Sequence, residues 1–254
     1  MDWTAPLPQL TQNLNALLSR AKPQDVLQAV LGGPRKTAMV SSFGADSVVL
    51  LHMVSRLDRD VPILFLDTEM LFPETLRYQS EVAETLGLTN VQVIKPNRDE
   101  VFLRDTDGLL HRADTDACCH LRKTRPLQKA LSGYETWITG RKRFQAATRA
   151  DMPVFENEGG KRLKVNPLAT WETKDIAAYI DAHNLPRHPL VARGYPSVGC
   201  APCTHPVAPG QDPRSGRWAG QDKVECGIHF ENGKFVRGTQ PDTGPAPTKA
   251  PEDA

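Results

Sequence analysis

Strand-like and helix-like segments alternate along the first two thirds of this chain. "TAMVSSF" (37–43) is a short apolar run rich in β-forming residues, and a tight turn leads from it into "VVLLHMVSRL" (48–57), where apolar positions recur at helical spacing. The same order returns with a strand at 61–68 and a helix at 73–86. Strands that alternate with helices predict an α/β fold built on a doubly wound, mainly parallel sheet.

The alternation continues to about residue 183, and the composition then changes. We expect strands at 91–96, 134–140 and near 162–168, helices at about 116–131 and 172–183, and a polar connection over 141–161. From Leu185 onward Pro, Gly, Arg and His dominate. The predicted organisation is a globular domain over 1–204, a flexible tail over 205–238 and a disordered terminus over 239–254.

Overall charge and hydrophobicity exclude several classes of function. The 254 residues carry 31 Lys and Arg against 30 Asp and Glu, a formal net charge of +1, so no global field attracts nucleic acid or an anionic membrane. No segment approaches the roughly 18 to 20 apolar residues of a membrane span, and the N-terminus does not resemble a secretion signal. We expect a cytoplasmic protein whose cysteines stay reduced, so that clustered cysteines indicate metal binding or catalysis.

The turn after the first predicted strand is a candidate anion site. "SSFGADS" comprises Ser41, Ser42, Phe43, Gly44, Ala45, Asp46 and Ser47. Small residues where a strand opens into a helix leave backbone N–H groups and the positive end of the helix dipole facing a bound anion. A tight connection without a ligand explains the same residues equally well, and the turn lacks the Gly-Lys-Ser/Thr of a Walker motif.

The second predicted strand ends in Asp67 and Thr68. In open α/β sheets, ligands bind at the carboxyl edge of the strands. Helix capping by Thr68 is the alternative explanation. Polar residues follow both the first and the second predicted strand, and this combination favours a nucleotide pocket.

Four of the five cysteines form two pairs. Cys118 and Cys119 are adjacent, and Cys200 and Cys203 form a C-x-x-C in a Gly/Pro loop. Four thiolates complete the ligand set of zinc or of an iron–sulfur cluster. An adjacent pair fits a single tetrahedral zinc poorly, whereas a [4Fe–4S] cubane presents separate iron corners. The spacing therefore favours a cluster, with zinc and coincidental buried thiols as the alternatives.

Cationic side chains accompany the cysteines. Lys123 follows Cys119 by four residues, which places both on one face of an α-helix. Further basic residues are Arg141, Lys142, Arg143, Arg149, Arg214 and Arg217, and the guanidinium groups of the arginines match phosphate and sulfate oxygens. The alternative is that some of these are solvated surface charges.

The fifth cysteine is a candidate nucleophile. Cys226 lies in the predicted flexible tail, with His229 three residues later. A thiolate is the reactive form of cysteine, and nearby cationic groups favour it, whereas the adjacent Glu225 opposes it.

Together, "SSFGADS", "LDTE", "CCHLRKTRPL", "GCAPCT", "RSGRW" and "ECGIH" resemble the assimilatory adenylyl-sulfate (APS) reductases. These enzymes are the iron–sulfur branch of the phosphoadenylyl-sulfate (PAPS) reductase family. The resemblance spans about residues 35 to 230. It implies a Rossmann-like fold of the adenine-nucleotide α-hydrolase type and thioredoxin-dependent reduction of APS to sulfite and AMP through an S-sulfocysteine, in sulfate assimilation and cysteine biosynthesis.

The resemblance also implies roles for individual residues. One [4Fe–4S] cluster per chain is held by Cys118, Cys119, Cys200 and Cys203, and Cys226 is the nucleophile. Lys123, Arg149, Arg214, Arg217 and His229 handle the phosphosulfate, while Ser41 to Ser47 and Asp67–Thr68 resemble the adenosine and phosphate site. Glu69 departs from the Gly that many members have after Leu-Asp-Thr, and Phe144 breaks the more usual Arg-Arg/Lys-Asp-Gln run.

Three other functions remain open from the sequence. A PAPS reductase, or an enzyme of dual specificity, would act on the 3′-phosphorylated nucleotide. A tRNA-thiolating ATP-pyrophosphatase shares the fold, but Phe43 replaces the first Gly of its Ser-Gly-Gly-x-Asp-Ser turn. A non-catalytic zinc-binding module is the third. A thioredoxin or glutaredoxin-like reductant is the expected protein partner, no nucleic acid or membrane partner is expected, and a homo-oligomer is left open.

Overall fold

The computed structural model describes residues 1–221, 223, 227, 230–231 and 234–235. Its centre is a six-stranded sheet in the order β3-β2-β1-β4-β6-β5. The strands are β1 (Thr37–Ser41), β2 (Ile63–Leu66), β3 (Val91–Ile94), β4 (Thr136–Ile138), β5 (Phe155–Glu158) and β6 (Arg162–Val165). All neighbouring pairs are parallel except β5 with β6. The predicted doubly wound, mainly parallel sheet is thus confirmed.

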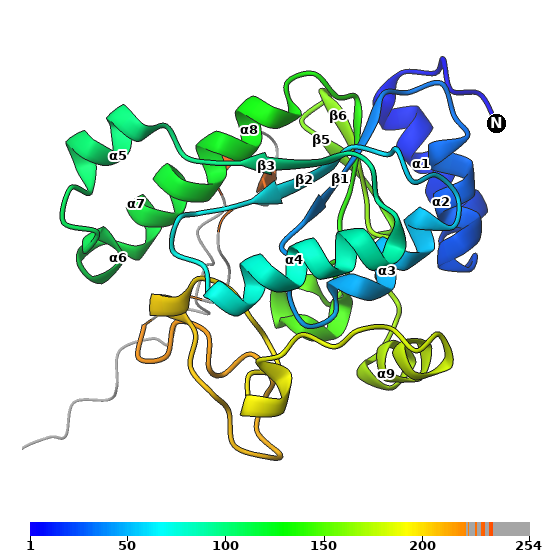
Figure 1. Cartoon of the computed structure of the whole chain (residues 1–254). Coiled ribbons are helices and arrows are strands. Elements are labelled where there is room, and N and C mark those ends of the chain that lie inside the picture. The colour runs from blue at the N-terminus through cyan, green and yellow to red at the C-terminus, as the bar shows by residue number, and fades with distance from the viewer. Residues whose placement is uncertain (222, 224–226, 228–229, 232–233, 236–254) are drawn as a thin grey trace, which may run out of the picture.

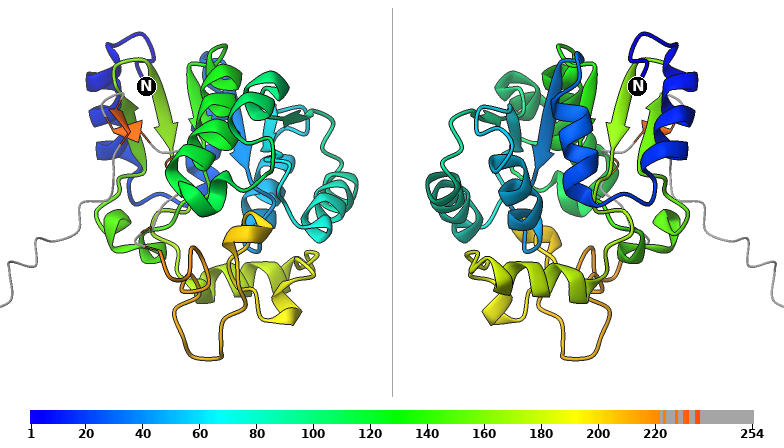
Figure 2. Two further views of the ribbon diagram at one scale, coloured as in Figure 1. Left: turned by 90° about the vertical axis from the view of Figure 1, so that its left-hand side faces the viewer. Right: turned by 90° about the vertical axis from the view of Figure 1, so that its right-hand side faces the viewer.

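Helices cover both faces of this sheet (Figures 1 and 2). One face packs its apolar side chains against α1 (Leu7–Leu18), α2 (Pro23–Leu31), α3 (Ser47–Ser55), α4 (Pro73–Leu86) and α9 (Thr173–Ala182). The other face, with Trp137 at its centre, packs against α8 (Arg125–Leu131). Because both faces are buried, β1 and β2 are apolar at almost every position, as expected of parallel strands.

One expectation about local structure was wrong, and several helices were not anticipated. The segment 141–161, expected to be a polar connection, contains β5, which joins the edge of the sheet antiparallel to β6. Its sequence, FENE, is polar because an edge strand is only partly covered. The structure also has helices that no prediction covered, which are α1, α2, α5 (Arg98–Arg104) and α6 (Leu110–Ala113).

The helix expected over 116–131 is divided into three segments. These are α7 (Thr115–Cys119), a π-helical turn over His120–Thr124 and α8. Asp114 caps α7 by accepting a hydrogen bond from the Ala117 N–H at 2.8 Å. A π-helix pairs residues i and i+5, so the α-helical relation predicted between Cys119 and Lys123 does not hold across this turn. Single π-helical turns occur frequently at functional sites.

The remaining described elements are short. They comprise 3₁₀ turns at Arg143–Gln145, Ala147–Arg149, Val191–Arg193 and Ala201–Cys203, and a two-stranded ribbon of β7 (Phe230–Glu231) and β8 (Lys234–Phe235). No helix among the described residues combines the length and the apolarity needed to cross a bilayer. The domain limits at 204 and 238 and the tail's flexibility stay predictions.

A buried histidine gives the fold a defined response to acid. His188 Nε2 lies 3.1 Å from Thr75 Oγ1, and Nδ1 accepts a hydrogen bond from the Leu190 N–H at 3.2 Å. Burial lowers the pKa of His188 to about 4. Because the unfolded chain then binds this proton more readily, the free energy of unfolding should fall as the pH drops from about 6.5 to 4, by up to about 3 kcal/mol.

Urea unfolding at pH 4.5 and 7.5 tests this expectation. His188→Asn should lower stability at pH 7.5 but reduce the difference between the two pH values, since asparagine keeps an acceptor near Leu190 and cannot titrate. An equal pH difference in both proteins would contradict the assignment.

Candidate active site

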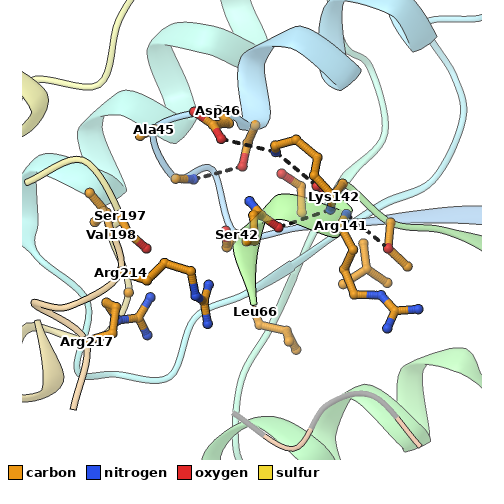
Figure 3. A pocket seen from close by; sticks show the side chains of 18 of the residues that line it. Ser42, Ala45, Asp46, Leu66, Arg141, Lys142, Ser197, Val198, Arg214 and Arg217 are labelled. Atoms are coloured by element: carbon orange, nitrogen blue, oxygen red, sulfur yellow. Dashed lines mark hydrogen bonds and ion pairs between the residues drawn. The ribbon is translucent and has the colours of Figure 1, made fainter. Parts of the chain in front are cut away.

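A pocket of about 270 Å³ opens where the winding of the sheet reverses. The chain proceeds from β1 outward through β2 to β3 and then returns to the other side of β1 with β4. In doubly wound folds, ligands bind outside the carboxyl ends of the strands at this switch point. The turn after β1 and the loop after β4 form two of the walls, and the segments 196–200 and 212–218 close the pocket from the other side (Figure 3).

Most of the predicted substrate residues line this pocket. They are Ser41, Ser42, Gly44, Asp46, Ser47, Thr68, Lys123, Arg149, Arg214 and Arg217. Met39, Val40, Leu66 and Trp137 form an apolar part of the wall. The fold therefore brings together, from segments far apart in the chain, an apolar surface and several cationic side chains. This combination suits a molecule with a flat apolar part and an anionic part.

Two of the predicted substrate residues do not line the pocket. Phe43 is fully buried with its ring 5.2 Å from that of Phe65, so it anchors the turn to the core. The Asp67 carboxylate accepts a hydrogen bond from the Glu69 N–H at 2.9 Å and pairs with Lys95 at 3.5 Å. Asp67 thus stabilises the chain reversal after β2, as a local polar cap would. Direct substrate contact by either side chain is not supported.

Backbone strain is concentrated beside the pocket. Phe43, Glu69 and Trp218 have φ values of 48°, 60° and 50°, in the left-handed region that non-glycine residues rarely occupy. Such strain persists only where surrounding contacts hold it, commonly at functional sites. The positive φ of Glu69 explains why many members of the family have glycine at this position. In this chain the glutamate that replaces the glycine forms an ion pair with Arg122 at 3.9 Å. The other departure, Phe144, lines the pocket and is partly exposed.

The four predicted cluster cysteines are brought together. All four are buried and free of disulfides. Burial and the charges of Cys119 and Cys200 raise the pKa of Cys118 to about 12, and burial and the charges of Cys200 and Cys119 raise that of Cys203. These mutual effects arise only between thiols that are close in space. Holding several of them as thiolates requires added positive charge.

Cys200 differs from the other cysteines because it faces the pocket. Burial raises its pKa, but the charge of Lys123, a hydrogen bond with Thr68 Oγ1 at 3.2 Å and the charge of Arg217 together bring the pKa below the ordinary value. Lys123 also hydrogen-bonds with Cys200. The same lysine lines the pocket, so it contacts both the cysteine group and the space available to a ligand.

Buried contacts fix the cysteine segments to the strand ends. Arg122 donates to Asp105 at 2.9 Å and to the Thr68 carbonyl at 3.0 Å, which ties the π-helical turn to the end of β2. The Ala201 N–H donates to the Met70 carbonyl at 2.8 Å, which ties the C-x-x-C loop to the same segment. Both halves of the cysteine group are therefore held against the residues that follow β2.

Trp218 connects the cysteine group to the arginines. Its side chain is buried against Cys200 and Cys203, and its backbone N–H donates to the Cys203 carbonyl at 3.1 Å. The guanidinium groups of Arg217 and Arg214 lie 4.5 and 6.0 Å from the ring centroid, within the range of cation–π attraction. The "RSGRW" motif contained this residue, but no pattern in the sequence indicated which groups its ring would contact.

Sequence reasoning also missed the pairing of charges behind the pocket wall. Lys142 is fully buried, with Nζ 3.1 Å from Asp46 and 3.2 Å from the Gly140 carbonyl. Burial lowers the pKa of Lys142, while Asp46 opposes that shift. The predicted nucleophile Cys226 and the predicted ligand His229 lie outside the described residues, so their positions are untested.

The fold and the pocket together define a class: a doubly wound α/β protein with a cation-lined pocket at its switch point and four thiols beside it.

The family model of the phosphoadenosine phosphosulfate reductase domain matches residues 36–206. An adenosine 5′-phosphosulfate reductase of Mesorhizobium japonicum is 52% identical over 219 residues, covering 85% of this chain and 86% of its own. A phosphoadenosine 5′-phosphosulfate reductase of Gloeobacter violaceus is 40% identical over 76% of this chain and 82% of its own.

A solved structure shows the same relationship. The phosphoadenylyl-sulfate reductase of Candida auris superimposes with a TM-score of 0.67 at 30% identity, covering 78% of this chain and 97% of its own. The chain belongs to the phosphoadenosine phosphosulfate reductase family and is an oxidoreductase. The family resemblance seen in the sequence is confirmed.

Proposed function

We propose that this protein reduces adenosine 5′-phosphosulfate to sulfite and AMP, with Cys226 as nucleophile and thioredoxin or a glutaredoxin-like protein as reductant. The observation that carries the proposal is the position of Lys123, which lines the switch-point pocket and hydrogen-bonds with Cys200. Relatives that carry the name adenosine 5′-phosphosulfate reductase support this substrate. A cytoplasmic location would keep the five cysteines reduced.

The pocket suits such a nucleotide in two parts. The apolar wall of Met39, Val40, Leu66 and Trp137 would accept the base, and the cations would accept the phosphosulfate. Preorganised charges are usually the largest contribution to stabilising a transition state. Lys123, Arg149, Arg214 and Arg217 would therefore stabilise the charge that develops on the AMP phosphate as it leaves.

The proposed chemistry has two displacement steps. In the first, the Cys226 thiolate attacks the sulfate sulfur, the new S–S bond forms, and the bond to the phosphate oxygen breaks with its electron pair going to AMP. In the second, a thioredoxin thiolate attacks Cys226 Sγ and releases sulfite, and the second thioredoxin thiol resolves the mixed disulfide. Thioredoxin thus supplies both electrons and Cys226 returns to its thiolate.

Sulfite release from APS by the purified full-length protein, with reduced thioredoxin, tests the function directly. We expect turnover with thioredoxin and a single-turnover burst of AMP without it. A protein that binds APS but releases neither AMP nor sulfite would contradict the proposal.

The donor set fits an iron–sulfur cluster. Cys118, Cys119, Cys200 and Cys203 would hold it, since they are buried, mutually close and drawn from two segments. Among the described residues, no three His, Cys, Asp or Glu side chains converge tightly enough to hold a single metal ion. The adjacency of Cys118 and Cys119 suits ligands for separate iron corners better than ligands for one zinc. We propose that the bound cluster orders the site and is not cycled during turnover.

Cys200→Ser provides a test of this ligand set. Anaerobically purified wild-type protein should contain four iron and four sulfide per chain in the proposed cluster, with brown absorption, and Cys200→Ser should lose most of both. Thr124→Ser, a conservative change on the same π-helical turn, should keep the iron. Zinc without iron in the wild-type protein would contradict the cluster.

A further inference from the structure

Among the six cations that line the pocket, two pairs lie apart. Lys123 and Arg217 lie beside Cys200, at the end proposed to receive the phosphosulfate. Arg141 and Lys142 lie on the loop that follows β4, and Figure 3 shows the Arg141 guanidinium directed away from Arg214 and Arg217. A nucleotide bound with its phosphosulfate at the first end leaves the second group to face the rest of the molecule.

Arg141 is held by a buried network that does not involve the phosphosulfate end. Its Nη2 forms an ion pair with Glu156 Oε1, and its Nε donates to Asn166 Oδ1 at 3.3 Å. Asn166 is fully buried, and its Nδ2 donates to the same Glu156 oxygen at 2.6 Å. Thr139 Oγ1 donates to Asn166 Oδ1 at 2.7 Å. These contacts fix both the arginine and its carboxylate.

Strand register places Glu156 where it meets a second cation. Glu156 on β5 pairs with Lys164 on β6, and Lys164 pairs in turn with Trp137 on β4. Lys164 Nζ lies 3.7 Å from Glu156 Oε1 and 5.2 Å from the centre of the Trp137 ring. One carboxylate therefore compensates two cations behind the apolar wall, and burial lowers the pKa of Lys164 to about 8.

Lys142 is compensated as well. Its ammonium group pairs with Asp46 at 3.1 Å, so both Arg141 and Lys142 already have a carboxylate partner. A second phosphate on the ribose would bring about two negative charges and three acceptor oxygens. To receive it, Arg141 would have to leave Glu156, and that carboxylate would remain partly buried with a weakened set of partners.

We propose that Glu156 is a specificity-determining residue, which makes the pocket favour a nucleotide without an additional ribose phosphate by holding the Arg141 guanidinium. This inference rests on the proposed function. Selectivity would then come from the Arg141–Glu156 ion pair. A nucleotide with a ribose phosphate must break this pair in order to bind, whereas a nucleotide without that phosphate leaves the pair intact.

Binding of AMP and of adenosine 3′,5′-bisphosphate, measured by calorimetry on the full-length protein, tests the inference without catalysis. Wild-type protein should bind AMP more tightly. Glu156→Gln, which keeps the shape and the Asn166 hydrogen bond, should bind the bisphosphate about fivefold to tenfold more tightly while AMP affinity changes less than about twofold. Glu158→Gln is the matched control, because that carboxylate lies on the same strand but pairs with Arg162 at 2.7 Å.

The double variant Glu156→Gln/Arg141→Met should bind the bisphosphate no more tightly than the wild-type protein does, because the Arg141 guanidinium released in Glu156→Gln is the group that would bind the added phosphate. If Glu156→Gln does not fold, Glu156→Leu/Lys164→Met removes the buried carboxylate and cation together and should release Arg141 equally.

Equal affinity of wild-type protein for both nucleotides would overturn the inference, as would an unchanged affinity ratio in the folded variant. Either result leaves the proposed function standing if AMP binds. Failure of wild-type protein to bind either nucleotide would instead reject the proposed function, and the inference with it.

Discussion

Replacing Cys226 with serine is expected to lower sulfite release from APS by about 10⁴-fold or more, because the nucleophile of a covalent mechanism is removed. A serine hydroxyl is not ionised at neutral pH, and an O-sulfonated serine offers thioredoxin no sulfur of the enzyme to attack. Because AMP lacks the sulfate group that Cys226 would attack, and Cys226 is not a proposed cluster ligand, AMP affinity and iron content should stay close to those of the wild-type protein.

Mass spectrometry distinguishes this role from a structural one. With APS and no reductant, wild-type protein should gain the mass of one SO₃ group on the peptide that contains Cys226, and Cys226→Ser should gain none. Sulfite release by the variant at a rate near that of the wild-type protein would refute the assignment of the nucleophile.

The second large effect is expected at Gly199, through Arg217. A Cβ at this position would lie 2.5 Å from Arg217 Cζ and 2.7 Å from Nη1, which is closer than real contacts allow. The Arg217 guanidinium is also held by the Trp218 ring at 4.5 Å, so it cannot move aside without losing that stacking. Gly199→Ala should therefore displace a charge at the phosphosulfate end and lower kcat/KM by about 10²-fold.

Three controls separate displacement of Arg217 from damage to the neighbouring Cys200. Iron content should be retained in Gly199→Ala, and Arg217→Ala should show a loss of similar size. Gly133→Ala, where the nearest atom to an added Cβ is Lys36 Nζ at 4.0 Å, should have wild-type kinetics. Unchanged kcat/KM for Gly199→Ala would show that Arg217 is not positioned by this contact.

Much of the architecture could be predicted from local patterns. The helix predicted over 73–86 matches α4, and four of the predicted strands lie at β1 to β4. The strands β1, β2 and β4 were predictable because buried parallel strands are short, mostly apolar runs. The strand β5 was not predicted because its sequence lacks such an apolar run. An edge strand with the sequence FENE has no apolar run, and its pairing is decided by the neighbouring β6.

The site was predictable to the extent that its residue types are distinctive. Four cysteines arranged as two pairs indicate a common metal or cluster site, and arginines in the same sequence indicate a site for an anionic ligand. By contrast, Asp67 shows the limit of that reasoning, because its carboxylate serves the chain reversal at Glu69 and Lys95 and does not line the pocket. A carboxylate at a strand end has the same sequence signal in either role.

The sequence by itself determined the alternation of strands and helices around the parallel strands, the chemistry of the two cysteine pairs and the membership of the family. These properties depend on residue type and on spacing along the chain. Only the tertiary structure decided which charges are compensated: Lys142 by Asp46, Arg141 by Glu156, and Cys200 by Lys123. The members of each pair come from different segments of the chain, and burial makes the strength of such a pairing depend on a few ångströms of separation that no local pattern encodes.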